Sequence, residues 1–260
     1  YDKTDIVGGS QRVLKIGHFY DSCYQIGLKN YTLKLAPGYD LSTDSCMYCD
    51  FVSGPFAAKR EFLLKFFPKS FKGVLSSLHF FVELFKNSRS ALSCPDVMFH
   101  VDKPDDFNDL KREEWFEFVI KHELNRIALP TNIDFFYTCS EAKMSCSPPK
   151  GVIMPICCLK ELTDAMLRIF RLWKEHNINS VMESGTVIGS LKFGGTIPWE
   201  RDEDITFNFH NLTVFEKLLP LFRSKGYKME VTYLKPYFKD FDKCRKNGLS
   251  CIYYAYRTKH

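Results

Sequence analysis

The sequence predicts a mixed α/β (α+β) protein with a mixed sheet, built from two domains. Its 260 residues exceed the roughly 100–200 residues that one domain usually contains. The 45% of hydrophobic and 26% of charged residues are typical of a soluble globular protein. Short apolar runs typical of buried strands alternate along the chain with segments of helical periodicity.

The charge and hydropathy of the chain exclude two classes of protein. The 36 Lys and Arg residues outnumber the 31 Asp and Glu residues only slightly and are scattered, which argues against nucleic-acid binding. No apolar run approaches the roughly 18 residues of a membrane-spanning helix. The nearest, 73–85, contains His79 and Glu83 and fits an amphipathic helix. Because no signal-peptide pattern begins at Tyr1, we expect any targeting or anchoring segment upstream of it.

The first half of the chain contains helices, strands and turns in alternation. Residues 59–67 form a short apolar segment with a helical pattern, and residues 95–101 are an apolar run that predicts a buried strand. The apolar spacing in 105–129 predicts an amphipathic helix. Ser53–Pro55 is a turn sequence.

The second half opens with a Cys-rich segment. Residues 139–158 hold four Cys, three Pro and one Gly, so no regular element can run through them. A strong amphipathic helix follows, and its apolar face ends at Trp173, a core residue. The later pattern predicts a strand at 180–184, a helical turn at 185–195, a strand at 197–209, a helix from Thr213 to Gly226 with a capping box, and two strands at 227–234 and 250–257.

Ten cysteines, several in close pairs, indicate an oxidising compartment or a metal site. The sequons at Asn30 and Asn211 favour the secretory pathway and N-glycosylation. Cys46-x-x-Cys49 has the spacing of a redox or zinc pair, but we favour a structural disulfide among Cys23, Cys46, Cys49 and Cys94. A local disulfide is expected between Cys244 and Cys251, which bracket an Asn247-Gly248 turn.

Acidic residues in 200–204 are the first candidates for chemistry. Asp202 and Asp204 lie two apart on the predicted strand, so both side chains leave the same face, and Glu200 joins them if the strand begins early enough. Paired carboxylates repel each other unless a cation or protons intervene, and Mg²⁺ or Mn²⁺ is the cation that such a pair holds together with substrate phosphates. The alternative is an exposed strand edge charged for solubility.

A Gly-rich segment precedes these carboxylates. Gly185 and Gly189 allow the backbone to approach a ligand closely, and amides at a helix N-terminus favour phosphate. Ser190 and Lys192 add a hydroxyl group and a positive charge. A Gly-Ser turn followed by Asp-x-Asp has the layout of a nucleotidyltransferase active site.

The segment GTVIGSLKFGGTIPWERDEDITF resembles the LicD and fukutin-related family of phospho-alcohol and phosphocholine transferases. This resemblance implies a nucleotidyltransferase-like catalytic domain in which Asp202 and Asp204 hold Mg²⁺ or Mn²⁺. Bacterial members of the family usually have further Asp residues where this chain has Glu200 and Arg201, so the resemblance implies no role for these two positions. The positions that fall on the family motif are Gly185, Thr186, Gly189, Ser190, Lys192, Gly195, Ile197, Pro198, Trp199, Asp202 and Asp204.

The Cys-rich segment extends the resemblance. The spacing of Cys139, Cys146, Cys157 and Cys158 is similar to the zinc loop of fukutin-related members. Four thiolates suit tetrahedral Zn²⁺. Two disulfides are the alternative that an oxidising compartment allows, and we favour zinc because a Cys157–Cys158 bond would be strained.

The resemblance also implies the domain organisation. Residues 1–136 resemble a glycosyltransferase-like (GT-A-like) stem that is incomplete here, 137–158 are the zinc loop, and 159–260 are the catalytic domain. Members of the family have a third acidic residue in a His-x-Asp segment, which we expect beyond His260, so the catalytic domain is C-terminally truncated. Asp240 and Asp242 are flanked by lysines and are expected to be solvated loop charges.

The implied function is transfer of a phospho-alcohol from a CDP-activated donor to a glycan acceptor during glycoprotein glycosylation, with ribitol 5-phosphate the favoured group. The fragment itself is expected to be inactive if its site is cut short. The alternatives are a phosphocholine transferase and an inactive lumenal scaffold of the same fold. The implied location is the Golgi or ER lumen in a type II membrane protein, with the stem as a possible site of homo-oligomer assembly.

Overall fold

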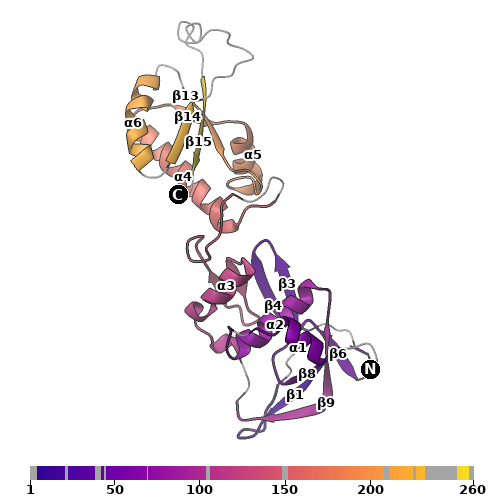
Figure 1. Ribbon diagram of the computed structural model, residues 1–260. Coiled ribbons are helices and arrows are strands. Elements are labelled where there is room, and N and C mark those ends of the chain that lie inside the picture. The colour runs from indigo at the N-terminus through magenta and orange to yellow at the C-terminus, as the bar shows by residue number, and fades with distance from the viewer. Residues whose placement is uncertain are drawn as a thin grey trace. The chain divides into compact units, whose positions relative to one another are not determined.

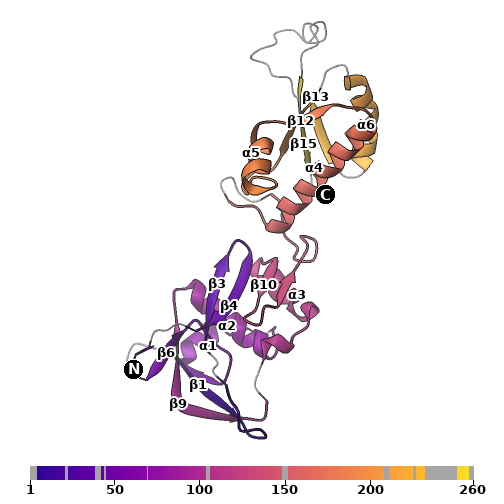
Figure 2. The same cartoon turned by 180° about the vertical axis from the view of Figure 1, so that it is seen from behind.

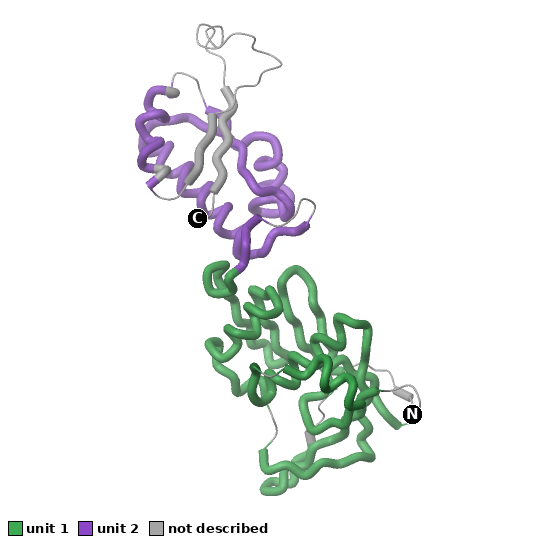
Figure 3. Tube along the Cα trace, in the orientation of Figure 1, with its two compact units in different colours: residues 1–143 green, residues 144–260 purple. Residues whose placement is uncertain are grey.

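The computed structural model describes residues 5–20, 23–38, 42–43, 45–68, 70–103, 106–147, 152–207, 211–224, 227–231 and 251–257. The chain divides into two compact units, Tyr1–Lys143 (unit 1) and Met144–His260 (unit 2), which are coloured separately in Figure 3. The division falls within the Cys-rich segment. Asp240, Asp242, Cys244 and the Asn247-Gly248 turn lie outside the described residues.

The first sheet of unit 1 has the strand order β2-β1-β9-β6-β5, and β8 pairs with β1. The central pair, β1 and β9, is parallel, whereas β2 and β8 run antiparallel to β1 and β6 runs antiparallel to β9. The sheet is therefore mixed, as expected from the sequence. Its strands are β1 (Ile6–Val13), β2 (Phe19–Tyr20), β5 (Ser42–Thr43), β6 (Cys46–Cys49), β8 (Phe56–Ala58) and β9 (Ala91–Val101).

The second sheet of unit 1 has the order β11-β10-β4-β3-β7 and is also mixed, because β10 and β4 are parallel while the other pairs are antiparallel. The hairpin of β3 and β4 forms its centre (Figure 1). Its strands are β3 (Cys23–Lys29), β4 (Thr32–Pro37), β7 (Phe51–Val52), β10 (Arg126–Ala128) and β11 (Asp134–Phe136).

Helices of unit 1 cover these sheets with aromatic side chains. Phe80 and Phe81 of α2 and Trp115 and Phe118 are almost fully buried, and Phe81 packs edge-on against Phe51. Such large buried rings supply most of the apolar area that stabilises a domain of this size. The helical elements are α1 (Arg60–Phe66), α2 (Val74–Lys86), the 3₁₀ turns η1 (Phe107–Asp109) and η2 (Arg112–Trp115), and α3 (Phe116–His122).

The amphipathic helix predicted over 105–129 is much shorter in the structure. Only α3 is α-helical, and it ends where Glu123 adopts a left-handed backbone with φ 53°. Leu124 N then donates to Val119 O, and Arg126–Ala128 leave the helix to pair with β4. The helical periodicity was real, but strand pairing with a distant segment overrides local propensity here.

Two disulfides close the core of unit 1, which confirms the disulfides expected among the first four cysteines. Cys23 bonds to Cys49, and Cys46 bonds to Cys94. Because β6 pairs antiparallel with β9 with Met47 opposite Ser93, Cys46 and Cys94 face each other one position further along. All four cysteines are buried, so these bonds are part of the packed core.

Unit 2 contains one described sheet of order β12-β13-β15-β14, in which every pair is antiparallel. Figures 1 and 2 show α5 and α6 on opposite sides of this sheet. The elements are α4 (Ile156–Glu175), β12 (Ser180–Met182), α5 (Ser184–Phe193), β13 (Glu203–Phe207), α6 (Leu212–Ser224), β14 (Tyr227–Val231) and β15 (Cys251–Arg257).

The core of unit 2 forms where α4 and α6 meet β13. Trp173 of α4 is fully buried and packs edge-on against Phe207 of β13 and Phe215 of α6, which confirms its predicted place in the core. This apolar cluster fixes one face of β13, and with it the position of the acidic residues on the same strand. In the part of the chain that the structure describes, no helix combines the length and the apolar character needed to span a membrane.

The strand predicted at 197–209 is shorter and begins only at Glu203. Glu200 N donates to Ile197 O, so the Ile197–Glu200 segment forms a turn before the strand. Pro198 lies within this turn and lacks the N–H that a strand interior needs. As a result Asp204 lies on β13, whereas Asp202 lies in the irregular segment that precedes it.

Candidate functional site

Helix α5 begins directly after β12 and lies against the turn that leads to β13. A Cβ atom on Gly189 would lie 2.5 Å from Gly195 O and 3.1 Å from Ile197 N, so only glycine permits this backbone contact. The helix ends at Gly194, whose φ of 68° is a left-handed conformation that favours glycine. The sequence Gly-x₄-Gly-Gly thus holds the 195–197 turn against the helix.

Asp204 is the most informative side chain of unit 2. Its backbone N–H donates to Thr186 Oγ1 at 2.6 Å, which ties β13 to the first turn of α5. Its Oδ1 is buried and has no hydrogen-bond partner among the residues that the structure describes. Burial raises the pKa of Asp204 to about 6, and the neighbouring charges of Asp202, Glu203, Glu200 and Glu183 add to the increase. A buried carboxylate oxygen without a donor is costly, and a bound cation would offset that cost.

Glu203 is a second buried carboxylate of the same strand. Its side chain accepts a hydrogen bond from Thr196 Oγ1, and Thr196 in turn contacts Thr163 of α4, with 3.1 Å between the two hydroxyl oxygens. Burial raises the pKa of Glu203, while the hydrogen bonds from Thr196 and Thr186 lower it in part. Strand alternation places it on the same face as Ile205 and Phe207, opposite to that of Asp204.

Glu183 completes the group of carboxylates. It is half-buried between β12 and α5, and its backbone N–H donates to Asp204 O at 3.0 Å. Its Oε2 accepts a hydrogen bond from Thr206, which lies on the same face of β13 as Asp204. The Glu183 side chain is therefore held beside Asp204 by the strand pairing of β12 with β13.

The residues predicted to bind phosphate lie at different places along α5. Thr186 is in the first turn and bonds Asp204, and Gly185 is adjacent to Glu200, whose Cγ would lie 4.0 Å from a Cβ on Gly185. Ser190 is exposed in a later turn, and Lys192 lies exposed in the last turn. The structure therefore brings Gly185 and Thr186 to the carboxylates and leaves Ser190 and Lys192 on the solvent-facing part of the helix.

Sequence reasoning missed Glu183 and Glu203. Both lie directly beside the predicted motif, Glu183 two residues before Gly185 and Glu203 between the two predicted aspartates. Glu203 gave a usable signal, because an acidic residue that alternates with apolar Ile205 and Phe207 points toward the core. Glu183 offered none, since its role depends on which strand pairs with β13.

The Cys-rich segment is oxidised in the structure. Cys146 and Cys158 form a disulfide, and Cys139 and Cys157 are disulfide-bonded as well. The structure thus contains the alternative to the zinc site that we favoured from the sequence. Zinc requires thiolates, so a zinc site in this segment would need the reduced cysteines.

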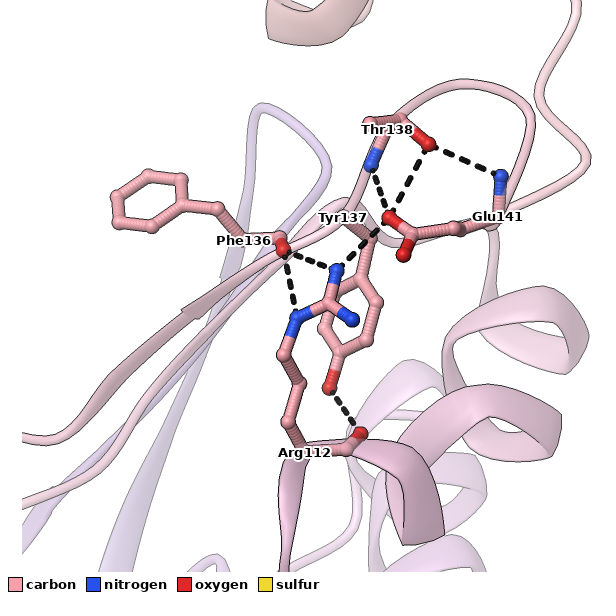
Figure 4. A network of polar contacts seen from close by, with 5 residues as sticks. All are labelled: Arg112, Phe136, Tyr137, Thr138 and Glu141. Carbon is pink, nitrogen blue, oxygen red and sulfur yellow. Dashed lines mark hydrogen bonds and ion pairs between the residues drawn. The ribbon is translucent and has the colours of Figure 1, made fainter.

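A polar network in unit 1 fixes the residues directly before Cys139 (Figure 4). Arg112 donates to Phe136 O and, at 2.7 Å, to Glu141 Oε2. Glu141 also accepts from Thr138 N and Oγ1, and Tyr137 OH donates to Arg112 O. The hydrogen bond from Arg112 and, after it, those from Thr138 lower the pKa of Glu141 to about 2. Burial raises the pKa of Tyr137 to about 12. Each charge has its partner here, so the network is structural.

The part of the chain that contains these carboxylates is similar to a known protein family. Residues 177–260 match the family described as "LicD/FKTN/FKRP, nucleotidyltransferase domain". The chain is also similar to the uncharacterized protein RT0683 of Rickettsia typhi (strain ATCC VR-144 / Wilmington), with 34% identity over 59 residues, or 23% of this chain and 19% of that protein. The chain thus spans only a small part of the length of that relative. The family match confirms the resemblance inferred from the Gly-rich and acidic motif.

Proposed function

We propose that this chain, whose residues 177–260 belong to the LicD/FKTN/FKRP family, is part of a transferase that moves a phospho-alcohol from a CDP-activated donor to a glycan. The family implies a transferase of phosphocholine or ribitol phosphate. Ribitol 5-phosphate is the group that we favour, and glycoprotein glycosylation is the process in which we place it. The domain would have the nucleotidyltransferase-like fold, preceded by a glycosyltransferase-like stem.

The buried, unpartnered Oδ1 of Asp204 carries this proposal. It lies among the charges of Asp202, Glu200, Glu203 and Glu183, and a bound cation would stabilise the charged form of such a group. Carboxylate oxygens are the ligands that Mg²⁺ and Mn²⁺ prefer, so the donor set fits the expected ion. Asp202 and Asp204 would hold it, and when bound it would neutralise charge on the donor pyrophosphate.

The other residues of the site would position the donor. Thr186 holds β13 against the first turn of α5, so the amides of that turn and Asp204 keep a fixed spacing. Amides at a helix N-terminus bind phosphate oxygens, which is the role we propose for Gly185. The N–H of Thr186 donates to Glu183 O, so Thr186 would contribute to donor binding by holding this turn in place. Gly189 keeps the turn before β13 in place, and Ser190 and Lys192 would reach only a ligand that extends along the helix. Catalysis would then be mainly positioning and charge neutralisation.

For the Cys-rich segment we propose a structural Zn²⁺ bound by Cys139, Cys146, Cys157 and Cys158 when they are reduced. The oxidised and zinc-bound forms exclude each other, because the same sulfur atoms are used in both. Zinc content measured with and without a reductant distinguishes them.

The cellular setting is part of the proposal. We place the protein in the Golgi or ER lumen as the lumenal part of a type II membrane protein, and a homo-oligomer through unit 1 would be compatible with a stem. The disulfides Cys23–Cys49 and Cys46–Cys94 support an oxidising compartment. Asn30 lies exposed in the turn between β3 and β4, where a glycan would be accommodated, and Asn211 is the second proposed glycosylation site.

One observation supports phosphocholine as the second candidate group. Phe193 and Trp199 are both about half exposed and form an edge-on pair with 6.0 Å between ring centroids. Aromatic faces of this kind attract a quaternary ammonium group. The binding experiment below therefore compares CDP-ribitol with CDP-choline as the donor.

The test is calorimetric binding of CDP-ribitol, CDP-choline and CDP to the full-length lumenal protein with Mn²⁺. We expect metal-dependent binding of one CDP-alcohol, weakened by about 100-fold or more in Asp202→Asn/Asp204→Asn. The matched control is Asp164→Asn, which removes an exposed carboxylate of α4 and should bind like the wild type. Binding of none of the three ligands would leave the inactive lumenal scaffold as the function.

A further inference from the structure

Two histidines, a glutamate and a lysine meet between α2 and α3 in unit 1. His79, Glu83 and Lys86 lie four and three residues apart on α2 and so share one face of the helix, while His122 is the last residue of α3. One ligand atom from each of His79, Glu83 and His122 lies within 4.8 Å of the others. The proposed transferase site makes no use of these residues.

The hydrogen bonds assign the protonation of both rings. Lys86 Nζ lies 3.1 Å from His122 Nδ1, and an ammonium group can only donate, so His122 Nδ1 is the acceptor. The proton of the neutral His122 ring is then on Nε2 and is donated to His79 Nδ1 at 2.9 Å. The lone pair of His79 Nδ1 thus accepts this proton, while the lone pair of His122 Nδ1 faces Lys86.

Burial keeps these rings neutral. The His122 side chain is fully buried, and this burial, followed by the charge of Lys86, lowers its pKa to about 3. Burial also lowers the pKa of His79. Phe118 and Phe71 pack against the two rings, with 4.4 Å between the centroids of Phe118 and His122. This packing holds both rings in place between α2 and α3.

We propose that His79, Glu83 and His122 form a binding site for a divalent transition-metal ion, with Zn²⁺ as the ion that this donor set suits. Two histidines and one carboxylate are a known three-ligand zinc set with a fourth position for water. When the ion binds, the proton of His122 moves from Nε2 to Nδ1, so that His79 Nδ1 and His122 Nε2 both offer a lone pair. These two nitrogens are 2.9 Å apart, near the separation of about 3.3 Å between two nitrogens bound to one tetrahedral zinc.

Lys86 competes with the ion for these side chains. Its ammonium group lies 3.0 Å from Glu83 Oε1 and 3.1 Å from His122 Nδ1, while these two acceptor atoms are 3.6 Å apart. The ammonium group thus pairs with the carboxylate ligand and holds the proton of His122 on Nε2, and both effects compete with binding of the ion. The Lys86 side chain is 43% exposed and can turn into solvent, which opens a path for the ion from the surface. The bound ion links α2 to α3 and stabilises unit 1.

The first test measures zinc bound per chain by full-length lumenal protein after equilibrium dialysis. Excess Mg²⁺ occupies oxygen-only sites, and a non-reducing buffer keeps the disulfides closed. We expect His79→Gln/His122→Gln to bind one zinc ion fewer per chain than the wild type. The control His100→Gln removes an exposed histidine of β9 and should bind as much zinc as the wild type. Equal zinc in the double variant and the wild type would overturn the proposal.

The second test keeps all three ligands in place. Lys86→Met removes the competing ammonium group, so we expect zinc to bind about tenfold more tightly in calorimetry. Lys65→Met, which changes an exposed lysine of α1, is the matched control and should leave the affinity unchanged. An unchanged zinc affinity in Lys86→Met, or no zinc binding by it, would refute the site even if the histidine variant does not fold.

Discussion

Glu141 in unit 1 and Asp204 in unit 2 are carboxylates in opposite electrostatic situations. The hydrogen bond from Arg112 and those from Thr138 lower the pKa of Glu141 to about 2. Burial and neighbouring acidic residues raise the pKa of Asp204 to about 6, and one of its oxygens is buried without a donor. The first carboxylate has its counter-ion within the fold and stabilises it. The second has no such counter-ion in the described part of the chain, which is the property expected of a residue that binds a cation.

The largest effect is expected from a change in the backbone contact that holds Asp204 in place. In Gly189→Ala the new Cβ would lie 2.5 Å from Gly195 O, so α5 or the 195–197 turn has to move. Thr186 and Thr196, which bond Asp204 and Glu203, would move with them. We expect donor affinity, measured by calorimetry with Mn²⁺, to fall by about 100-fold.

The matched control for this variant is on the same helix. Leu191 is 81% exposed, so Leu191→Ala changes α5 without touching the turn, and its donor affinity should equal that of the wild type. Donor binding by Gly189→Ala that matches Leu191→Ala would mean that the carboxylates do not depend on this backbone contact.

The next effect concerns protons, which compete with a metal ion for Asp204. Its pKa of about 6 is above the usual aspartate value, so the charged form is lost as pH falls through 6. The Mn²⁺ affinity should therefore be constant above pH 7 and fall about tenfold between pH 7 and pH 5. Calorimetric titrations at pH 7, 6 and 5 measure this. If the Mn²⁺ affinity were unchanged down to pH 5, carboxylates with an ordinary pKa would bind the ion. Asp204 would then not differ from Glu141 in the way described above.

The sequence predicted the motif of the site but not its full set of charges. Asp202, Asp204 and the Gly-rich helix were recognisable because their residue types and spacing are local properties. The roles of Glu183 and Glu203 were not, because they depend on strand pairing and burial. The start of the strand was also misplaced, since the turn at Pro198 was read as part of it.

The same distinction applies to the fold. Mixed α/β structure, helices α1, α2 and α4, and the core position of Trp173 followed from composition and periodicity. The helix predicted over 105–129 failed because Arg126–Ala128 pair with a strand nearly a hundred residues earlier. The set of disulfide-bonded cysteines in unit 1 was predicted, but four cysteines allow three pairings, and only the register of β6 against β9 selects one.

The smallest expected effect returns to the paired carboxylate. Glu141→Gln removes the charge that accepts from Arg112 and Thr138, and we expect the free energy of unfolding to fall by about 1 kcal/mol, a value reduced by the partial exposure of the pair. Asp134→Asn breaks the more exposed Arg126–Asp134 pair of β10 and β11 and should cost about 0.5 kcal/mol or less. In metal-free protein Asp204→Asn removes a charge that its acidic neighbours repel, so it should not lower the free energy of unfolding. Urea unfolding at pH 7 measures this free energy for all three variants. If Asp204→Asn lowered it as much as Glu141→Gln, the distinction between the two carboxylates would be contradicted.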